Sequence, residues 1–514
     1  MAIQPRKRLP VHILRIIWIL LVIYYERVAF HVSVHSCEWP DDLLPESLNS
    51  AGQPRPEHIL LVADPQILDA YSYPRRSPIL SSLTKLIVDL NMKKNWDAAL
   101  RKSPDAVVFL GDMMDGGRRD IPTEQYEGLA TRFAGIFQFP QDLPVYFIPG
   151  NHDIGIGTPR TFKQSPQAYQ RYVKQFGQPN QIVSIANHSL VLFDAPSHVR
   201  EDSQRHGQRK KFEDWIPIPG GSYEFAERFG KVPHHDPIIL FTHIPFYRPD
   251  GKSCGPLRER GSLRPGAGDG YQNTIEKDSS IRLLENIKPV AIFSGDDHDY
   301  CEYVHHFDLG NGIPRITTEI SVKSFSMTMG VRRPGFQLLS LAPAQLRDPK
   351  KPTYADEPCL LPDQIQVYLQ RYLVFLVLSL LSVAILNFDL NFSRGSRAQQ
   401  YAVLPDLEES KEEGVASDDE AAPSFSSYAL PTPTTSSDRP PRSRGWLIPP
   451  TNPRIASSTP SKLTRSVRSF WPGNLHAHSR RRRSWAGRVL RDIRDIAIPS
   501  LCLFILLNWW VMTW

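Results

Sequence analysis

Short apolar runs alternate with longer amphipathic stretches between residues 57 and 345. The five clearest runs are "HILLVA", "AVVFLG", "PVYFIPG", "PIILFT" and "PVAIFSG". They are rich in β-branched and aromatic residues without polar interruption, which is typical of strands buried on both faces. The stretch between the first two, "LTKLIVDLNMKKNWDAALRK", has apolar residues at helical spacing. This alternation predicts an α/β fold in which helices cover buried sheets.

Three further apolar runs lie outside this region and are potential membrane spans. The N-terminal "MAIQPRKRLPVHILRIIWILLVIYY" places a basic head before an apolar core, as signal peptides and signal anchors do. No convincing small-x-small cleavage site follows, so we favour an uncleaved anchor over a cleaved signal peptide. Residues 372–388 and 498–514 are uncharged and about long enough to span a bilayer core. The alternative for both is a buried core helix.

The basic residues around these runs predict their orientation. Clusters of Lys and Arg precede the first run, follow the second and precede the third. The positive-inside rule places all three clusters in the cytosol. The segment between the last two runs is rich in Ser, Pro, Thr and Glu, and is predicted to be disordered because it has too little apolar surface for a core. The predicted parts are a basic head with a membrane anchor (1–30), a luminal domain (31–365), a span (372–388), a disordered cytosolic segment (391–490) and a last span (498–514).

Cysteine usage agrees with a luminal domain. Four of the five cysteines, Cys37, Cys254, Cys301 and Cys359, lie between residues 31 and 365. An even number permits two disulfides in three possible pairings. We favour Cys254–Cys301, because each follows a polar motif closely, and this choice leaves Cys37 with Cys359. Free buried thiols are the alternative. In the same region "NHS" makes Asn187 a candidate for N-glycosylation.

Each of the five predicted strands ends at a side chain that can bind a metal. In α/β sheets, functional sites form at the carboxyl ends of strands, where loops fan out from a rigid base. One polar residue at a strand end carries little information, but five in one domain predict a metal site. These residues are Asp64, Asp112, Asn151, His243 and Asp296.

The motifs that contain these residues carry a family resemblance. In order, "ADPQ", "GDMMDGGR", "GNHD", "THIP" and "GDDH" resemble the five motifs of the calcineurin-like metallophosphoesterases. The resemblance implies a β-sandwich of two mixed sheets flanked by helices, here combined with transmembrane helices. Longer stretches such as "YSYPRR", "FTHIPFYRPDGKSCGPLRE" and "SGDDHDYC" are similar to the fungal cell-division-control branch of the superfamily. That branch resembles enzymes that trim ethanolamine phosphate from glycosylphosphatidylinositol (GPI) anchors early in the secretory pathway.

Motif matching also implies a pair of metal ions with shared ligands. The ligands of one metal would be Asp64, Gln66, Asp112 and His298. Those of the other would be Asp112, Asn151, His243 and Asp296, with Asp112 as the bridge. Gln66 and Asp296 stand where the family usually has histidine, so each exchanges nitrogen for oxygen. Oxygen-rich sites suit Mn²⁺ or Mg²⁺ better than Zn²⁺, and we therefore predict two divalent ions, with manganese as the metal.

The same resemblance implies three further roles. His152 in "GNHD" would be the general acid that protonates the leaving alkoxide. Asp115 matches the position that orients this histidine. Arg118 would bind the substrate phosphate, because guanidinium groups hold phosphate in a bidentate way. Two glycines separate it from Asp115, unlike the usual family motif, and Arg119 is the alternative.

The expected function is removal of an ethanolamine-phosphate side branch from the mannose core of GPI anchors. The expected location is the endoplasmic reticulum membrane, in a multi-pass arrangement with a luminal catalytic domain, and the early Golgi is the alternative. A phosphomonoesterase or a lipid pyrophosphatase on the same scaffold is a second possibility. A non-catalytic metal-homeostasis protein is a third, although it would not need His152. Nucleic acid is not an expected partner, because the densest basic run lies outside the catalytic motifs.

Overall fold

The structure is a computed structural model that describes most of the chain. Residues 1–389 and 485–514 form one compact unit, and residues 390–484 form another. The helices and strands described belong to the first unit, apart from residues 390–400 at the end of one helix. The described residues are 8–45, 55–156, 165–308, 314–343, 351–400 and 484–513. Most of the predicted disordered segment, from 401 to 483, therefore lies outside the described residues.

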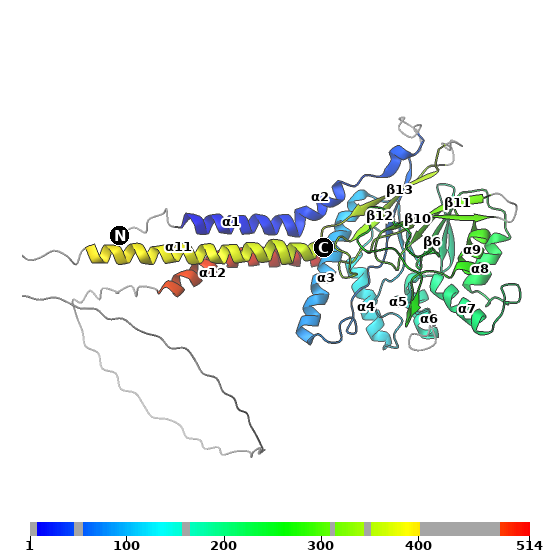
Figure 1. The fold of residues 1–514 in the computed structure, drawn as a ribbon, viewed down its shortest axis with the longest axis horizontal. Coiled ribbons are helices and arrows are strands. Elements are labelled where there is room, and N and C mark those ends of the chain that lie inside the picture. Colours follow the sequence, from blue (N-terminus) through cyan, green and yellow to red (C-terminus); the bar gives the residue numbers. More distant parts are fainter. Residues whose placement is uncertain are drawn as a thin grey trace, which may run out of the picture. The chain divides into compact units, whose positions relative to one another are not determined.

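Two mixed β-sheets form the centre of the domain (Figure 1). The first has five strands in the order β13-β12-β1-β2-β3, and its members β1, β2 and β3 are parallel. The second has six strands in the order β10-β11-β9-β6-β5-β4, and β5, β6, β9 and β11 are parallel. The first sheet comprises β1 (Glu57–Val62), β2 (Ala106–Phe109), β3 (Val145–Phe147), β12 (Gly335–Leu341) and β13 (Tyr354–Leu360). The second comprises β4 (Gln181–Ile185), β5 (His188–Phe193), β6 (Ile238–Thr242), β9 (Ala291–Ser294), β10 (Cys301–Asp308) and β11 (Pro314–Ser321). A separate hairpin pairs β7 (Ala267–Gly268) with β8 (Tyr271–Gln272).

The sheets pack face to face, and this explains the unbroken apolar runs. Alternate residues of a strand point to opposite faces. In β1, Ile59 and Leu61 join the core between the sheets, where they meet Phe241 and Phe293 of the second sheet. Leu60 and Val62 point the other way, into a core beneath the helices. Both faces of β1 are thus buried from Ile59 to Val62, and a polar residue would be unfavourable there.

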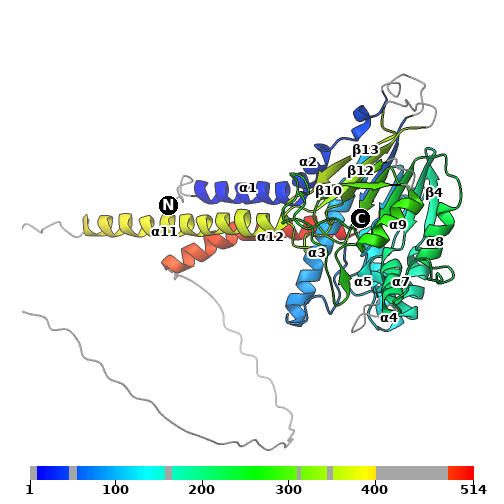
Figure 2. The ribbon, with the colours of Figure 1, turned by 45° about the vertical axis from the view of Figure 1, so that its right-hand side comes forward.

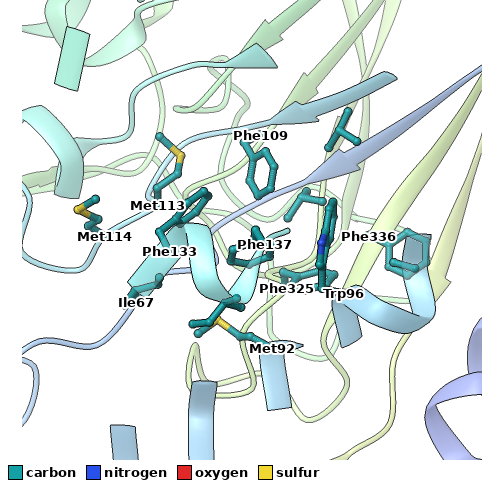
Figure 3. Close-up of a cluster of buried hydrophobic side chains, with 14 of the residues drawn as sticks. Ile67, Met92, Trp96, Phe109, Met113, Met114, Phe133, Phe137, Phe325 and Phe336 are labelled. Carbon is teal, nitrogen blue, oxygen red and sulfur yellow. The ribbon is translucent and has the colours of Figure 1, made fainter. Parts of the chain in front are cut away.

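Helices cover the outer faces of both sheets. α3 (Pro78–Ala99) and α4 (Thr123–Ile136) cover the first sheet, where Trp96 and Phe133 pack around Phe109 (Figure 3). On the second sheet, three helices pack against a core that includes Phe193 and Leu240 (Figure 2). These are α7 (Ala195–Gly207), α8 (Ser222–Gly230) and α9 (Lys277–Ile287). Two short helices, α5 (Asn151–Ile154) and α6 (Pro166–Phe176), follow β3. The predicted β-sandwich flanked by helices is confirmed.

Among the described residues, two helices are long and apolar enough to cross a membrane. These spans are Gln364–Phe388 and Trp485–Thr513. The first comprises α10 (Gln364–Gln366), a π-helical turn (Val367–Tyr372) and the start of α11 (Leu373–Gln400), and the second is α12 (Trp485–Thr513). Both helices extend beyond the predicted spans, so the segment 391–490 begins and ends in helix. The prediction of disorder was wrong at these two edges, where α11 continues to Gln400 and α12 begins at Trp485.

The N-terminal anchor is helical but does not form one regular helix. α1 (Leu9–Ile23) is followed by a π-helical turn (Tyr24–Val28) and by α2 (Ala29–His35), so helical structure extends past the predicted end at residue 30. The α1 segment packs against α11 and α12 through Val11, Val383 and Ile496. Trp18 also donates a hydrogen bond from Nε1 to Ser379 Oγ at 3.1 Å. The three apolar segments therefore form one helical bundle.

Both favoured disulfides are present in the structure. Cys37 is bonded to Cys359, which ties the end of the N-terminal helices to β13. Cys254 is bonded to Cys301 at the start of β10. The free-thiol alternative is thereby excluded for these four cysteines, and the second bond anchors the loop after β6 beside the last polar motif.

Candidate metal centre

The polar residues at the strand ends converge on one place between the two sheets. Asp64 follows β1 and Asp112 follows β2, while Asn151 starts α5 just after β3. His243 follows β6 and Asp296 follows β9 in the second sheet. Parallel strands of both sheets thus deliver their carboxyl ends to a common site, as strand-end loops do in other α/β folds. The structure brings all five residues together.

Two sets of ligand atoms in this place are close enough to hold metal ions. The first set is Asp64, Asp112 and His298, and the second is Asp112, His243 and Asp296. Within each set the ligand atoms lie within 4.8 Å of one another. Asp112 belongs to both, which is the arrangement needed for a carboxylate that bridges two cations.

The two predicted amide ligands lie directly beside these sets. Gln66 donates a hydrogen bond from Nε2 to Asp112 Oδ2 at 2.7 Å, and the same nitrogen lies 3.3 Å from His298 Nε2. Asn151 Oδ1 lies 3.1 Å from His243 Nε2. A half-turn of an amide exchanges its oxygen and nitrogen, so Gln66 can present its oxygen to a cation from the same position.

The backbone at this site adopts a conformation that is costly for residues with side chains. Five of the proposed ligands have positive φ: Asp64 (49°), Gln66 (42°), Asp112 (55°), Asp296 (62°) and His298 (68°). Non-glycine residues rarely occupy this left-handed region, and each such residue costs on the order of 1–3 kcal/mol. The turns aim the side chains inward, and the packed sheets hold them there.

Two motif glycines are required by close packing around the ligands. Gly111 has φ +94°, and a Cβ on it would lie 2.4 Å from His243 Nδ1. A Cβ on Gly150 would lie 2.0 Å from Asp112 Oδ1. Any larger residue would displace a ligand, which explains why glycine precedes the ligand in "GD" and "GNH".

The chemistry of the donors fits divalent cations. The buried carboxylates of Asp64 and Asp112 and the half-buried one of Asp296 gather around His243. Burial together with the charges of Asp112 and Asp296 raises the pKa of Asp64. Asp64 Oδ2 is buried and has no hydrogen-bond partner among the described residues. Cations would offset this crowding of negative charge, because buried charges are stable only when paired or bound to metal.

The two histidines direct ring nitrogens at the ligand sets. Burial opposes protonation of His243, but the charges of Asp112 and Asp296 outweigh it and raise its pKa, and a bound cation would take the place of that proton. His243 can donate from Nδ1 to the Leu110 carbonyl oxygen at 2.7 Å, which leaves the Nε2 lone pair directed at the site. Burial lowers the pKa of His298 to about 4, so its ring is neutral and can act as a ligand.

His152, Asp115 and Arg118 lie together at the rim of the site. His152 Nδ1 lies 2.7 Å from the Asp115 carbonyl oxygen and 3.1 Å from Asp115 Oδ1. Its backbone N–H donates to Asp112 Oδ1 at 2.8 Å. Burial opposes protonation of His152, but the Asp112 charge and the hydrogen bond to Asp115 outweigh it and raise its pKa. Arg118 Nη2 lies 3.5 Å from His152 Nε2, so a guanidinium and an imidazole face the same space.

Two supporting residues were missed at the sequence level. Ser72 Oγ donates to Asp115 Oδ2 at 2.5 Å and fixes the carboxylate behind His152. Asp153 accepts from the backbone N–H of Gly150 at 2.8 Å and of Met114 at 3.1 Å, which joins two ligand loops. Both lie in stretches that the sequence analysis singled out, Asp153 at the end of "GNHD" and Ser72 within "YSYPRR", but neither stretch indicated their supporting role.

The other aspartates of the last motif are engaged elsewhere. Asp297 forms an ion pair with Arg258. Asp299 accepts from Lys323 Nζ at 2.9 Å and from the backbone N–H of Glu259 at 2.8 Å. Both therefore brace the loop that carries Asp296 and His298.

Comparisons with known proteins agree with this site. The family model described as "Calcineurin-like phosphoesterase" matches residues 58–300, which include every proposed ligand. "Cell division control protein 1" of Saccharomyces cerevisiae is 35% identical over 390 residues, covering 74% of this chain and 74% of that protein. "Metallophosphoesterase 1 homolog" of Drosophila melanogaster is 24% identical and covers 76% of this chain and 95% of that protein. "Metallophosphoesterase 1" of Ailuropoda melanoleuca is 27% identical, with coverage of 66% and 81%.

A solved dimetal phosphatase from Danio rerio overlays with a TM-score of 0.32 and 12% identity, covering 59% of this chain and 99% of that one. That likeness is too weak to add to the assignment. The family model and the yeast relative are sufficient. This chain belongs to the calcineurin-like metallophosphoesterase family, whose fold implies a site for two divalent metal ions.

Proposed function

We propose that the protein is a metal-dependent phosphodiesterase that removes an ethanolamine-phosphate side branch from the mannose core of GPI anchors. The observation that carries the reaction class is the pairing of His152 with Asp115 beside two ligand sets that share Asp112. A binding protein would need the ligands but not an oriented acid. The motif resemblance to the cell-division-control branch supports the substrate class.

The residues of the site would have three different roles in phosphodiester hydrolysis. Asp64, Gln66, Asp112 and His298 would hold one metal ion, and Asp112, Asn151, His243 and Asp296 the other. Two bound cations supply an activated water and neutralise charge on the phosphoryl oxygens. His152, held by Asp115 through Nδ1, would donate the Nε2 proton to the leaving alkoxide. Arg118 lies close enough to His152 to bind a phosphoryl oxygen at the same time.

We propose manganese as the metal, because oxygen replaces nitrogen at Gln66 and Asp296. Hard oxygen donors favour Mn²⁺ and Mg²⁺ over Zn²⁺. Elemental analysis of gently purified full-length protein is expected to give two manganese ions per chain. Two zinc ions without manganese would contradict this part of the proposal.

We place the catalytic domain in the lumen of the endoplasmic reticulum, attached to its membrane. Two helices that can cross a membrane, the two disulfides and the exposed position of Asn187 support this placement. Disulfides persist in oxidising compartments such as this lumen. Removal of N-glycans by endoglycosidase is expected to shift the wild-type protein on a gel but not the Asn187→Gln variant.

The direct test uses full-length protein in detergent with Mn²⁺ and a panel of GPI glycans that carry ethanolamine phosphate on defined mannoses. Mass spectrometry should detect released ethanolamine phosphate, and His152→Ala should reduce the rate at least 100-fold. His306→Ala is the matched control, because His306 is exposed on β10 and should leave the rate unchanged. Release of inorganic phosphate from monoesters alone, with unchanged GPI glycans in a null strain, would reject the proposal.

A further inference from the structure

An apolar groove of about 530 Å³ lies where α3 meets α11 and α12. The volume is within the roughly 300–1,000 Å³ range of small-molecule pockets. Leu83 and Leu86 of α3 form one wall, Leu376 of α11 a second, and Ile496 and Phe504 of α12 a third. Such a lining selects a ligand by burial of hydrocarbon rather than by hydrogen bonds.

The groove runs along the helices that can span a membrane. Residues from Ile493 to Asn508 of α12 line it, which corresponds to about 22 Å at the 1.5 Å rise per residue of an α-helix. One leaflet of a bilayer core is roughly 15 Å thick. In a membrane the open side of this groove would face acyl chains instead of water, so its natural occupant is a long hydrocarbon chain.

The N-terminal half of α3 has the character of a helix at a membrane surface. Ile79 is 84% exposed, and Leu80, Leu83 and Leu86 are 45–49% exposed, although all four are large and apolar. The C-terminal half of α3 is buried in the domain. In Figures 1 and 2, α3 crosses the direction of α11 and α12 instead of running along it. An apolar helix face lying across the ends of spanning helices is typical of interfacial helices.

The segment just before α3 exposes basic and aromatic side chains. Arg75 and Arg76 are exposed, and Arg76 lies over the Tyr73 ring at 3.8 Å. Tyr71 is 46% exposed. Tyrosine is enriched at both membrane–water interfaces, and long basic side chains near a membrane surface extend their charged ends into the polar headgroup region.

The same segment touches the catalytic residues. Asp69 accepts from the backbone N–H of Tyr71 at 2.7 Å and of Ser72 at 2.9 Å, which fixes the loop. Ser72 in turn donates to Asp115, the partner of His152. One continuous stretch therefore leads from Gln66 at the metal centre to the apolar face of α3.

We propose that this groove binds an acyl chain of the lipid that carries the substrate phosphodiester, while the apolar half of α3 rests in the surface of the same leaflet. The inference rests on the proposed function for the identity of the substrate, but not for the binding of the chain. The lipid part of the substrate would then bind to α3, α11 and α12, and the phosphate part to the metal centre.

The first test measures binding without catalysis. Full-length protein in nanodiscs is irradiated with a phosphatidylinositol that carries a diazirine in its acyl chain, and labelled peptides are identified by mass spectrometry. Ala497→Phe should fill the groove and lower labelling of α3 and α12 groove residues at least fivefold. Ala486→Phe is the matched control on an exposed part of α12 and should label as the wild type does. Equal labelling in both variants would overturn the proposal.

A second variant shows whether any loss of labelling comes from the groove itself or from misfolding of the helical bundle. Leu83→Ser with Leu86→Ser changes side chains that are half exposed, so the domain core is untouched. The same loss of labelling is expected. Unchanged labelling in this variant would also overturn the proposal.

The second test asks whether the bound chain belongs to the substrate. Ala497→Phe should lower kcat/KM about tenfold for a lipid-bearing GPI and leave the value for the delipidated glycan unchanged. Reduced labelling with normal turnover of the lipid substrate would identify a structural lipid and reject the substrate assignment. If the wild type labels as expected but hydrolyses neither substrate, the proposed function fails while the acyl-chain site stands.

Discussion

Lys94 Nζ lies 2.5 Å from Glu26 Oε2 in an ion pair that is buried between the N-terminal helices and α3. The two side chains are 3% and 0% exposed. Glu26 Oε1 also accepts from the Tyr372 hydroxyl at 2.9 Å, in the π-helical turn before α11. One carboxylate thus connects the N-terminal helices, the catalytic domain and the helix that leaves it.

Lys94→Met should therefore destabilise the whole protein. The substitution leaves Glu26 buried without its cation, which typically costs about 3–5 kcal/mol. Thermal unfolding of full-length protein in detergent measures the loss. The double variant Lys94→Met/Glu26→Leu should recover most of it, because no unpaired charge remains. Lys174→Met is the control, since its pair with Glu127 is exposed and contributes little. Equal losses in the single and double variants would contradict the role of the charge pair.

Gly150→Ala should remove metal while leaving the fold in place. The new Cβ would stand 2.0 Å from Asp112 Oδ1, so the bridging carboxylate must move. We expect metal content below one ion per chain, measured by elemental analysis, and loss of phosphoesterase activity. Gly128→Ala in α4 has open space around its Cβ and should retain both ions, with stability raised by about 0.5–1 kcal/mol. Full metal content in the Gly150→Ala variant would show that the loop adapts.

Asp296→His should shift the metal preference from the proposed manganese toward zinc. The substitution supplies an imidazole nitrogen at a position that belongs to the second ligand set. Competition between Zn²⁺ and Mn²⁺ for the purified apoprotein gives the ratio of affinities, which should rise at least tenfold in favour of zinc. Asp297→His is the control, because Asp297 pairs with Arg258 and should not alter the ratio. An unchanged ratio in Asp296→His would place Asp296 outside the ligand set.

Asp356→Asn should stabilise the protein at neutral pH and not in acid. Burial raises the pKa of Asp356 to about 6, despite a hydrogen bond from Gln337, and Glu302 and Glu357 add to the shift. The unfolded pKa is about 3.9, so the fold favours the protonated form. The contribution of Asp356 to stability is complete below pH 4 and is lost as pH rises through 6.

The melting temperature should therefore be equal for wild type and variant near pH 4 and higher for the variant at pH 8. At pH 8 the free energy of unfolding of the variant should exceed that of the wild type by about 1–2 kcal/mol. This is less than the full pKa shift corresponds to, because the Asp356 side chain is partly exposed. Asp214→Asn, at an exposed position, should show no such pH dependence. A difference that does not vary with pH would contradict the assignment to Asp356.

The parts of the fold that depend on simple periodicity were predictable. The five apolar runs became β1, β2, β3, β6 and β9. Packing buries both faces of β2, β6 and β9 and most of β1, whereas β3, at the edge of its sheet, is half-buried. The later strands were less visible. β10 alternates buried and exposed residues. Its "YVHHF" segment suggests two histidines at the surface, but His305 is buried, and its Nε2 lies 2.7 Å from Glu319 Oε2. Its partner is on β11, and such a pairing cannot be read from one strand alone.

The candidate site was predictable where ligands sit directly at strand ends, and less so where loops support them. Asp112 and His243 follow apolar runs that fix their position. Ser72 and Asp153 support the site through hydrogen bonds to a different loop, Ser72 to Asp115 and Asp153 to the backbone of Met114. Such contacts between loops form only when the chain folds. The acyl-chain groove was also hidden, because Leu83 of α3 and Phe504 of α12 become neighbours only after the bundle has formed.

The left-handed backbone of the ligand loops affects how stable and how abundant the protein is in the cell. Five ligands with left-handed backbone and a group of repelling carboxylates cost the folded state free energy, and bound cations would offset the repulsion. Metal binding is then coupled to folding, since a ligand that binds only the native state stabilises it. A cell deprived of the metal would hold a larger open fraction of the chain, exposed to quality-control proteolysis. The abundance of the enzyme would follow the metal supply of its compartment, even with constant synthesis.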